Sequence, residues 1–281
     1  MTPGLNRPLI IAGPCAAESY ELMDAVASAM VELSVELQFD YVFKASFDKA
    51  NRTSLDSIRG VGLETTLQWF SDIKAKHGVR LLTDVHETYQ VAPVAKVCDV
   101  LQIPAFLCRQ TDLVAAAAAS GRIVNIKKGQ FMAPAAMSSI VDKARASAKR
   151  AQKHSDVWLT ERGVSFGYGN LVVDMRALPI MAKTGAPVIL DITHSTQLPA
   201  AGGEGGTVSG AQRQFAPVLA RAATATGYLS GFFLEVHTNP PQAISDKDAQ
   251  LTIAQARTLL RQLIPLWRHC QTSSAIDAEF S

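Results

Sequence analysis

Short apolar runs rich in β-branched residues alternate along the chain with longer segments in which apolar residues recur every three or four positions. The short runs are nearly continuous in apolar residues, which is typical of parallel strands buried on both faces. Eight such runs predict strands at residues 9–13, 41–45, 79–85, 100–105, 123–128, 157–161, 186–192 and 231–236. Helical spacing between them is clearest at residues 21–37, 64–78, 138–154, 212–227 and 250–269.

The repeated strand-then-helix unit favours one architecture. Eight units within 281 residues match the usual length of a (β/α)8 barrel. We therefore predict an α/β fold, a single (β/α)8 TIM barrel in which residues 1–281 form one catalytic domain, with a doubly wound open sheet as the main alternative. The loops at residues 46–62 and 199–210 follow the predicted second and seventh strands and are candidate lids.

Composition and charge exclude several classes of protein. A net charge of +2 without blocks of like charge argues against a nucleic-acid binder. No signal-peptide pattern or run of about eighteen apolar residues is present, so we expect a cytoplasmic protein without a membrane partner. The cysteines lack CxxC spacing and are expected to be thiols or a single metal ligand; they are Cys15, Cys98, Cys108 and Cys270.

Every predicted strand ends in polar or ionisable residues. Because a parallel strand buried on both faces is otherwise apolar, these residues indicate a shared polar mouth, although any one of them alone is as readily a solvated loop residue. They are Cys15, Lys44, Asp84, His86, Arg109, Lys127, Lys128, Glu161, Arg162, Asp191, His194, Glu235 and His237.

Cations gathered at this mouth favour an anionic ligand. The segment FKASFDKANRTS places three of them within nine residues. Unpaired buried cations are costly, so their clustering indicates a ligand with phosphate, carboxylate or both. The cations are Lys44, Lys49, Arg52, Arg109, Lys127 and Arg162.

A second group of strand-end residues has the chemistry of a metal site. His194 and Glu235 end neighbouring strands, Cys15 ends the first strand, and Asp246 follows in the last loop. Thiolate, imidazole and carboxylate together suit zinc, iron, cobalt or manganese, and the residues do not choose among these ions. The alternative for Cys15 is a small buried hydrophobic residue, which is the commoner role of a lone cysteine.

A series of motifs in order along nearly the whole chain resembles the 3-deoxy-D-manno-octulosonate 8-phosphate synthase family. The match is most specific at KANR and SFGYGNLVVD. Related heptulosonate 7-phosphate and sialic acid synthases share the barrel and the phosphoenolpyruvate chemistry but differ at KANR. The matching segments are IAGPCAAES, FKASFDKANRTS, RGVGLE, TDVHE, IPAFLCRQTDL, VNIKKGQF, TERGVSFGYGNLVVDMR, DITHSTQLP and FLEVH.

The resemblance implies condensation of phosphoenolpyruvate with D-arabinose 5-phosphate and water, with release of phosphate, in lipopolysaccharide sugar biosynthesis. It also implies a homotetramer in which Arg109 reaches a neighbouring subunit's site. The implied phosphoenolpyruvate ligands are Lys44, Ser46, Lys49, Lys127, Gln130 and Arg162. The implied sugar-phosphate ligands are Asn51, Arg52, Thr53 and Arg109. The implied catalytic residues are Lys49, Asn51, His194 and Asp246.

The family has a metal-dependent and a metal-independent class, which differ by Cys or Asn at the position of Cys15. The cysteine implies the metal-dependent class, with one divalent ion, Zn, Fe, Mn or Co, as cofactor. The implied ligands are Cys15, His194, Glu235 and Asp246. The chain departs from the family pattern at Thr53, at Thr238 with Asn239, and at Ala211.

Four other functions stay open on the sequence alone. One is a related phosphoenolpyruvate-dependent synthase of the heptulosonate 7-phosphate or sialic acid type. A second is a Schiff-base aldolase that uses Lys127 as nucleophile. The third and fourth are a metal-dependent hydrolase and a non-catalytic sugar-phosphate binding barrel.

Overall fold

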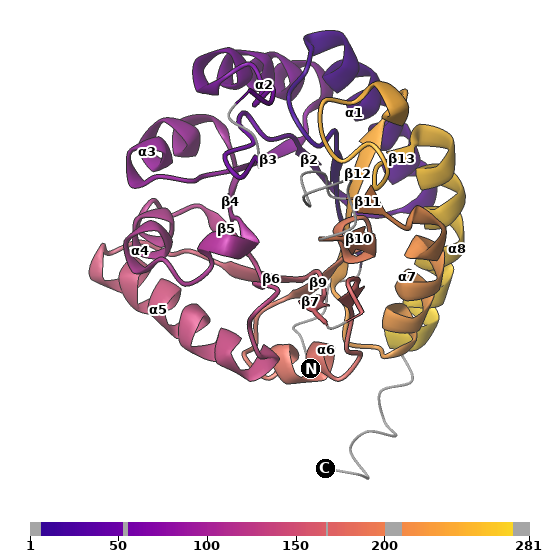
Figure 1. Ribbon diagram of the computed structural model, residues 1–281. Helices are drawn as coiled ribbons and strands as arrows, with labels where there is room; N and C mark the ends of the chain where they lie inside the picture. Colours follow the sequence, from indigo (N-terminus) through magenta and orange to yellow (C-terminus); the bar gives the residue numbers. More distant parts are fainter. Residues whose placement is uncertain (1–6, 53–55, 167, 200–209, 272–281) are drawn as a thin grey trace.

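A computed structural model describes residues 7–52, 56–166, 168–199 and 210–271. Eight parallel strands follow one another around a barrel, and the last pairs with the first (Figure 1). This closure excludes the open-sheet alternative and confirms the predicted (β/α)8 barrel. The barrel strands are β1 Leu9–Gly13, β2 Asp40–Lys44, β3 Arg80–Asp84, β4 Val100–Ile103, β5 Ile123–Lys127, β6 Val157–Glu161, β9 Val188–Asp191 and β12 Gly231–His237.

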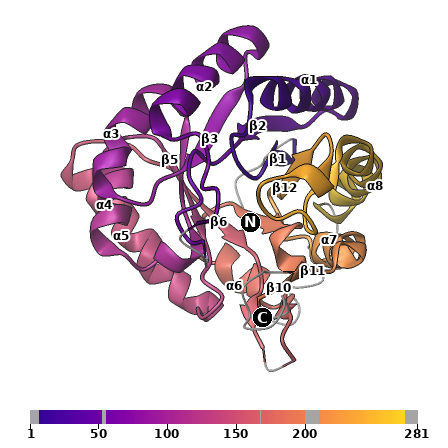
Figure 2. The same cartoon turned by 45° about the horizontal axis from the view of Figure 1, so that its top comes forward.

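Helices form a ring around the strands, as Figures 1 and 2 show. Local signals set several of their ends: the Ser19 hydroxyl caps the first helix by accepting from the Leu22 N–H, and Gly78 ends the second at φ +64°. The helices are α1 Tyr20–Leu37, α2 Leu63–His77, α3 Thr88–Val97, α4 Thr111–Ala119, α5 Met137–Arg150, α6 Ala177–Ala182, α7 Ala216–Ala225 and α8 Ile253–Gln271.

Short elements decorate the loops that follow the barrel strands. Strand β7 pairs with β8, β10 pairs with β11, and β13 extends the edge of β12. Their bounds are β7 Val164–Ser165, β8 Leu171–Val172, β10 Gln197–Leu198, β11 Gly210–Ala211 and β13 Leu251–Thr252. The 3-10 turns are η1 Ala105–Leu107, η2 Pro134–Ala136, η3 His194–Thr196, η4 Arg213–Phe215 and η5 Pro240–Gln242.

Two hydrophobic clusters flank the barrel strands. The larger one joins the strands to the helices, whereas the smaller contains strand residues alone and fills the barrel interior. Side chains on a strand alternate between its two faces, so the residue two positions further on also points inward. The interior cluster consists of Leu9, Ile11, Val42, Leu82, Val100, Trp158, Ile189 and Phe233, with Ile123 packed against it.

The next inward layer, toward the carboxyl ends of the strands, is polar. Each member follows a residue of the interior cluster by two positions and is buried. On β1 this position is Gly13, where a Cβ atom would lie 1.9 Å from the backbone oxygen of Lys44. The polar layer consists of Lys44, Asp84, Gln102, Asn125, Thr160, Asp191 and Glu235. The barrel thus changes from apolar to polar at the end where a TIM barrel carries its active site.

Across the described chain, every helix is too short or too polar to cross a lipid bilayer.

Candidate active site

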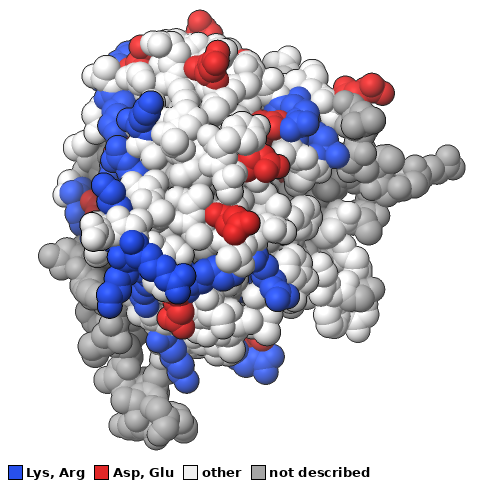
Figure 3. Space-filling view, turned by 90° about the vertical axis from the view of Figure 1, so that its left-hand side faces the viewer, with Lys and Arg blue, Asp and Glu red and all other residues white. Residues whose placement is uncertain are grey.

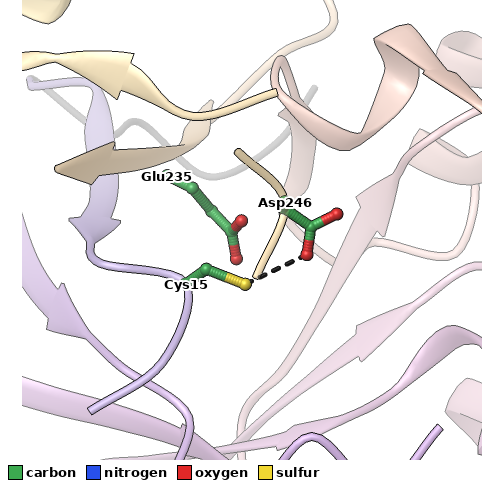
Figure 4. Close-up of side chains that lie close together, drawn as sticks. All are labelled: Cys15, Glu235 and Asp246. Carbon is green, nitrogen blue, oxygen red and sulfur yellow. Dashed lines mark hydrogen bonds between the residues drawn. The ribbon is translucent and has the colours of Figure 1, made fainter. Parts of the chain in front are cut away.

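A thiol and two carboxylates meet at the junction of the first and last barrel strands (Figure 4). The ligand atoms of Cys15, Glu235 and Asp246 all lie within 4.8 Å of one another. The register of β1 with β12 sets Gly13 opposite Glu235, so the turn after β1 carries Cys15 past this carboxylate. The Cys15 thiol donates a hydrogen bond of 3.1 Å to Asp246 Oδ2. We call these three residues the thiol–carboxylate cluster.

Hydrogen bonds hold Asp246 in this cluster. Its backbone has φ +50°, a left-handed conformation that is uncommon for residues other than glycine. The Ser245 hydroxyl donates to Asp246 Oδ2 over 2.9 Å, and the Gln197 amide donates to Oδ1. The Gln250 side chain accepts from the Cys15 N–H over 3.1 Å and donates to the Ser245 carbonyl over 2.8 Å. The loop after β12 is therefore tied directly to the end of β1.

Glu18 and His237 hold the loop that begins at Thr238 and Asn239. The Asn239 N–H donates to His237 Nδ1 over 2.8 Å, which leaves His237 Nε2 3.6 Å from a Glu18 carboxylate oxygen. The other Glu18 oxygen accepts from the Ile244 N–H over 3.2 Å. Glu18 and His237 thus brace the loop from both sides, and it delivers Asp246 to the cluster.

His194 lies beside the thiol–carboxylate cluster, where it contacts Glu235. Its Nε2 atom is 3.5 Å from Glu235 Oε2, and its Nδ1 atom is 2.6 Å from Asp191 Oδ2. The His194 N–H also donates to Asp191 Oδ1 over 2.9 Å. Because Asp191 occupies Nδ1, the imidazole presents Nε2 to the cluster, which is the usual arrangement of a histidine oriented for metal binding by a carboxylate.

The donor set fits a divalent metal ion. Glu235 Oε2 is buried and lacks a hydrogen-bond partner among the residues that the structure describes, which is a costly arrangement unless a cation completes it. Sulfur, imidazole nitrogen and two carboxylates are ligands of zinc, iron, cobalt and manganese sites. Cys15, His194, Glu235 and Asp246 would hold the ion.

The acid–base state of the cluster follows from its neighbours. Burial, followed by the charge of Glu235, raises the pKa of the Cys15 thiol well above its usual value. Burial opposes ionisation of Glu235 as well, but His194 and Lys44 hold its pKa below the usual value. For Asp246, His194 and Lys49 overcome burial in the same way and lower the pKa. A thiol beside two carboxylates therefore needs a further positive charge before it ionises.

Two of the predicted anion-binding lysines are neutralised by barrel carboxylates. Lys44, which is 1% exposed, donates to Glu235 Oε1 over 2.9 Å and to the Cys15 carbonyl over 3.0 Å. Lys127 pairs with Asp191, and its Nζ atom lies 3.4 Å from the Phe233 ring centroid. Burial lowers the pKa of Lys127, and Asp191 opposes that shift. The structure thus gives these two lysines internal partners, which the sequence did not reveal.

The remaining predicted phosphoenolpyruvate ligands surround the same interior. Lys49 is half-buried and donates to the Ser46 hydroxyl over 3.1 Å. Arg162 donates through one terminal nitrogen to Gln197, while its buried Nε has no hydrogen-bond partner in the described chain. The buried Gln130 Oε1 atom likewise lacks a partner within the described ranges. Gln197 therefore joins Arg162 to the thiol–carboxylate cluster.

The KANR segment lies next to the loop that carries Asp246. Arg52 donates to the Ile244 carbonyl over 2.7 Å and to the Ile58 carbonyl over 3.1 Å, while Asn51 is exposed. Thr53 lies outside the described residues, as does most of the candidate lid at 199–210.

Arg109 is a predicted ligand that the structure leaves outside the cluster. It is exposed on the segment after η1 and has no hydrogen bond or ion pair with any described part of its own chain.

Sequence reasoning assigned no role to several residues that build this site. Asp191 and Asp84 carried a signal, since both end predicted strands. Gln102 and Asn125 are polar residues inside apolar runs, and strand alternation places them on the inner face with Asp84. Gln197 lies in the matching segment DITHSTQLP, which did not predict its contacts, and the sequence offered no signal for Gln250.

The exposed cations of the protein lie elsewhere. Lys and Arg side chains gather on the side of the barrel that faces the viewer in Figure 3, and those of α5 and its following turn are exposed. They are Arg145, Lys149, Arg150 and Lys153. The cations that surround the thiol–carboxylate cluster are distinct from this surface because they are buried or half-buried; they are Lys44, Lys49, Lys127 and Arg162.

Comparison with known proteins adds independent findings. The model of the DAHP synthetase I family matches residues 2–272. Several curated relatives carry the name 2-dehydro-3-deoxyphosphooctonate aldolase. The protein from Albidiferax ferrireducens is 52% identical over 265 residues, which cover 94% of this chain and 92% of the relative.

Two further relatives of the same name have similar coverage. The Helicobacter hepaticus protein is 53% identical over 263 residues, which cover 91% of this chain and 95% of the relative. The Paraburkholderia phymatum protein is 48% identical over 280 residues, which cover 99% of this chain and 97% of the relative. With a family model that spans nearly the whole chain and relatives at about half identity, this chain belongs to the DAHP synthetase I family.

Proposed function

We propose that the chain is a metal-dependent 3-deoxy-D-manno-octulosonate 8-phosphate synthase. It condenses phosphoenolpyruvate with D-arabinose 5-phosphate and water in lipopolysaccharide sugar biosynthesis. Family membership, the name shared by the relatives and the KANR motif support this activity. The observation that carries it is the double contact of Lys44 with Glu235 and the Cys15 carbonyl, because it makes the cation group and the thiol–carboxylate cluster one site.

In the proposed reaction, a carbon–carbon bond forms between the phosphoenolpyruvate methylene carbon and the sugar aldehyde carbon. Water adds to the neighbouring phosphoenolpyruvate carbon, and the bond from that carbon to the phosphate oxygen breaks, so inorganic phosphate leaves. The work of the protein is to hold two anions in contact and to stabilise the oxyanion that develops on the aldehyde.

The proposed anion sites follow from the placement of the cations. The phosphoenolpyruvate ligands are Lys44, Ser46, Lys49, Lys127, Gln130 and Arg162. The buried Arg162 Nε atom supports this assignment, since it is a donor without a partner among the described residues. The sugar-phosphate ligands are Asn51, Arg52, Thr53 and Arg109.

The proposed cofactor is one divalent ion, Zn, Fe, Mn or Co, bound by Cys15, His194, Glu235 and Asp246. When bound, such an ion supplies Lewis-acid stabilisation of the aldehyde oxygen. Asp191 holds His194 in position, and the Gln197 and Ser245 hydrogen bonds hold Asp246. Lys49 and Asn51 are the proposed catalytic residues on the substrate side, with His194 and Asp246 on the metal side.

The proposed assembly is a cytoplasmic homotetramer of one-domain subunits, each spanning residues 1–281. The exposed position of Arg109, three residues after the 56%-exposed Phe106, supports a role across a subunit interface rather than within its own chain. The family match over residues 2–272 supports a single domain. A reduced thiol at Cys15 is required for metal binding, in keeping with a reducing compartment.

The deciding experiment is release of inorganic phosphate from phosphoenolpyruvate by metal-loaded protein. We expect release with D-arabinose 5-phosphate, little with a four-carbon sugar phosphate or N-acetylmannosamine, and loss of release after chelation. Equal release with the other acceptors would favour a related synthase, and none with any acceptor would favour a non-catalytic barrel. Phosphate release that is unchanged by the chelator would refute the metal assignment but not the synthase activity.

One observation favours a Schiff-base aldolase as a second candidate function. Burial lowers the pKa of Lys127, which makes its amine a better nucleophile. Its ion pair with Asp191 opposes that role by keeping the amine protonated. Borohydride added during turnover separates the two: an adduct on Lys127 supports the aldolase, and unmodified protein supports the synthase.

A further inference from the structure

Four buried side chains form a continuous row of hydrogen bonds across neighbouring barrel strands. The Thr160 hydroxyl donates to Asn125 Oδ1 over 2.7 Å, and Asn125 Nδ2 donates to Gln102 Oε1 over 2.8 Å. The Gln102 amide then donates to Asp84 Oδ1. Exposed fractions of the four side chains are at most 8%. We call Asp84, Gln102, Asn125 and Thr160 the amide ladder.

Strand register builds the ladder. Asp84 lies opposite Gln102 on β3 and β4, and Gln102 lies opposite Asn125 on β4 and β5. All four belong to the polar inward layer, so their side chains meet inside the barrel. Each amide therefore touches the next without a water or a backbone group between them.

The charge of Asp84 fixes the direction of every bond in the row. A carboxylate only accepts, so Gln102 must turn its NH2 group toward Asp84 and its oxygen toward Asn125. Asn125 must then turn its NH2 group toward Gln102 and its oxygen toward the Thr160 hydroxyl. Burial opposes ionisation of Asp84, but Lys44 and Lys49 hold its pKa below the usual value, so the carboxylate persists.

On its other side the ladder ends at the proposed substrate site. The Ser46 hydroxyl donates to Asp84 Oδ2, the oxygen that Gln102 does not use. Because its proton is committed to Asp84, Ser46 offers a lone pair to Lys49 Nζ, 3.1 Å away. The orientation of Asp84 thus determines where Ser46 and Lys49 point.

We propose that Gln102, Asn125 and Thr160 are positioning residues that set Ser46 and Lys49 for phosphoenolpyruvate through Asp84. The role rests on the proposed function, since it names what the two residues are set for. An apolar layer would fill the barrel as well, because replacing buried polar partners by apolar groups of similar shape is often neutral for stability. The ladder touches none of the four proposed metal ligands, so we expect its effect to fall first on phosphoenolpyruvate binding.

The test is Asn125→Leu, which keeps the side-chain size and leaves Gln102 Oε1 without its donor. We expect the KM and the dissociation constant for phosphoenolpyruvate to rise about tenfold, with the KM for arabinose 5-phosphate changed less than about twofold. Thr160→Val, at the end of the ladder away from Asp84, should also raise the KM for phosphoenolpyruvate selectively, but by a smaller factor. The control is Thr83→Val, because Thr83 is buried on β3 beside Asp84 and its hydroxyl has no partner among the described residues.

A double-mutant cycle separates positioning from simple loss of packing. In a Ser46→Ala background the Asn125→Leu effect on phosphoenolpyruvate affinity should largely vanish, because the contact through which it acts is gone. Additive effects, or equal losses for both substrates, would overturn the proposal. So would unchanged affinity in Asn125→Leu and Thr160→Val.

Calorimetric titration with phosphoenolpyruvate distinguishes a failure of the ladder proposal from a failure of the proposed function. If wild-type protein binds phosphoenolpyruvate but releases no phosphate, the synthase assignment fails, while the affinity ratios still decide the role of the ladder. If wild-type protein does not bind phosphoenolpyruvate, both proposals fail. Thermal unfolding of each variant confirms that the comparison is made on folded protein.

Discussion

Replacing Asp191 by asparagine probes the ion pair at the centre of the barrel mouth. The Asp191 carboxylate is fully buried and pairs with Lys127 and with His194 Nδ1. Asparagine keeps the shape, and its oxygen can still accept from the Thr193 hydroxyl and the His194 N–H, which both bond Oδ1. Its NH2 group, however, would face Lys127 Nζ and His194 Nδ1, which are donors and cannot accept a hydrogen bond from it. The substitution therefore removes the charge with little change in volume.

The expected cost follows from leaving Lys127 buried and unpaired. Removing one partner of a buried ion pair costs about 3 to 5 kcal/mol, since the other charge stays without compensation. Lys127 can avoid this cost by losing its proton and becoming neutral. Burial already favours the neutral form by lowering the pKa of Lys127. A base with a lowered folded pKa binds fewer protons than in the unfolded chain, so the variant should recover stability as pH rises. We expect a larger deficit at pH 6 than at pH 9.

The assay is urea unfolding of metal-free protein, with the midpoint and the slope compared between variants. The matched control is Asp174→Asn, because Asp174 pairs with Arg176 at the surface, where both side chains are exposed. We expect no measurable loss of stability in the control. A deficit in Asp191→Asn below about 1 kcal/mol, or one that grows with pH, would refute the view that Asp191 neutralises a buried lysine.

Three further predictions concern the metal, the sugar phosphate and pH. Cys15→Ala should lose bound metal and activity while its metal-free melting temperature falls by only about 2 to 4 °C, as metal analysis and calorimetry will show; retained metal would make Cys15 a core residue. Arg52→Ala should weaken arabinose 5-phosphate binding about tenfold with phosphoenolpyruvate binding nearly unchanged, and equal losses in titration would contradict the separate roles. Stability should fall as the pH drops from about 5 to about 3, because the lowered pKa values of Asp84, Asp191 and Asp246 contribute stability only while the unfolded carboxyls are ionised; a flat profile over this range would contradict this.

The barrel strands were predictable because burial on both faces leaves nearly continuous apolar runs. The helices that lacked a clear pattern are α3, α4 and α6: α3 has Pro93 inside, α4 contains five consecutive alanines, and α6 has six residues with Pro179 inside. Alanine does not distinguish a buried from an exposed face, and six residues give less than two turns of periodicity. Their existence follows from the repeated unit rather than from their own sequence.

The members of the site were partly predictable, but their pairings were not. Strand ends identified Lys127 and Asp191 separately, yet these residues are 64 positions apart and meet only through barrel closure and stagger. For the same reason the sequence suggested that external anions neutralise Lys44 and Lys127, whereas Glu235 and Asp191 do so. Side-chain partners in a barrel depend on register, which spacing along the chain does not encode.

The turn after β2 joins the two networks of the polar layer. Lys44 belongs to the charged side, where it contacts Glu235 and the Cys15 carbonyl, and Ser46 belongs to the amide ladder through Asp84. The Ser46 N–H also donates to the Cys15 carbonyl over 3.3 Å, so both residues share one acceptor at the end of β1. A shift of this turn would therefore move the proposed metal and phosphoenolpyruvate sites together. Because residues with shared partners are energetically coupled, substitutions at Glu235 and Asp84 should be non-additive in their effects on phosphoenolpyruvate affinity even though neither contacts the other.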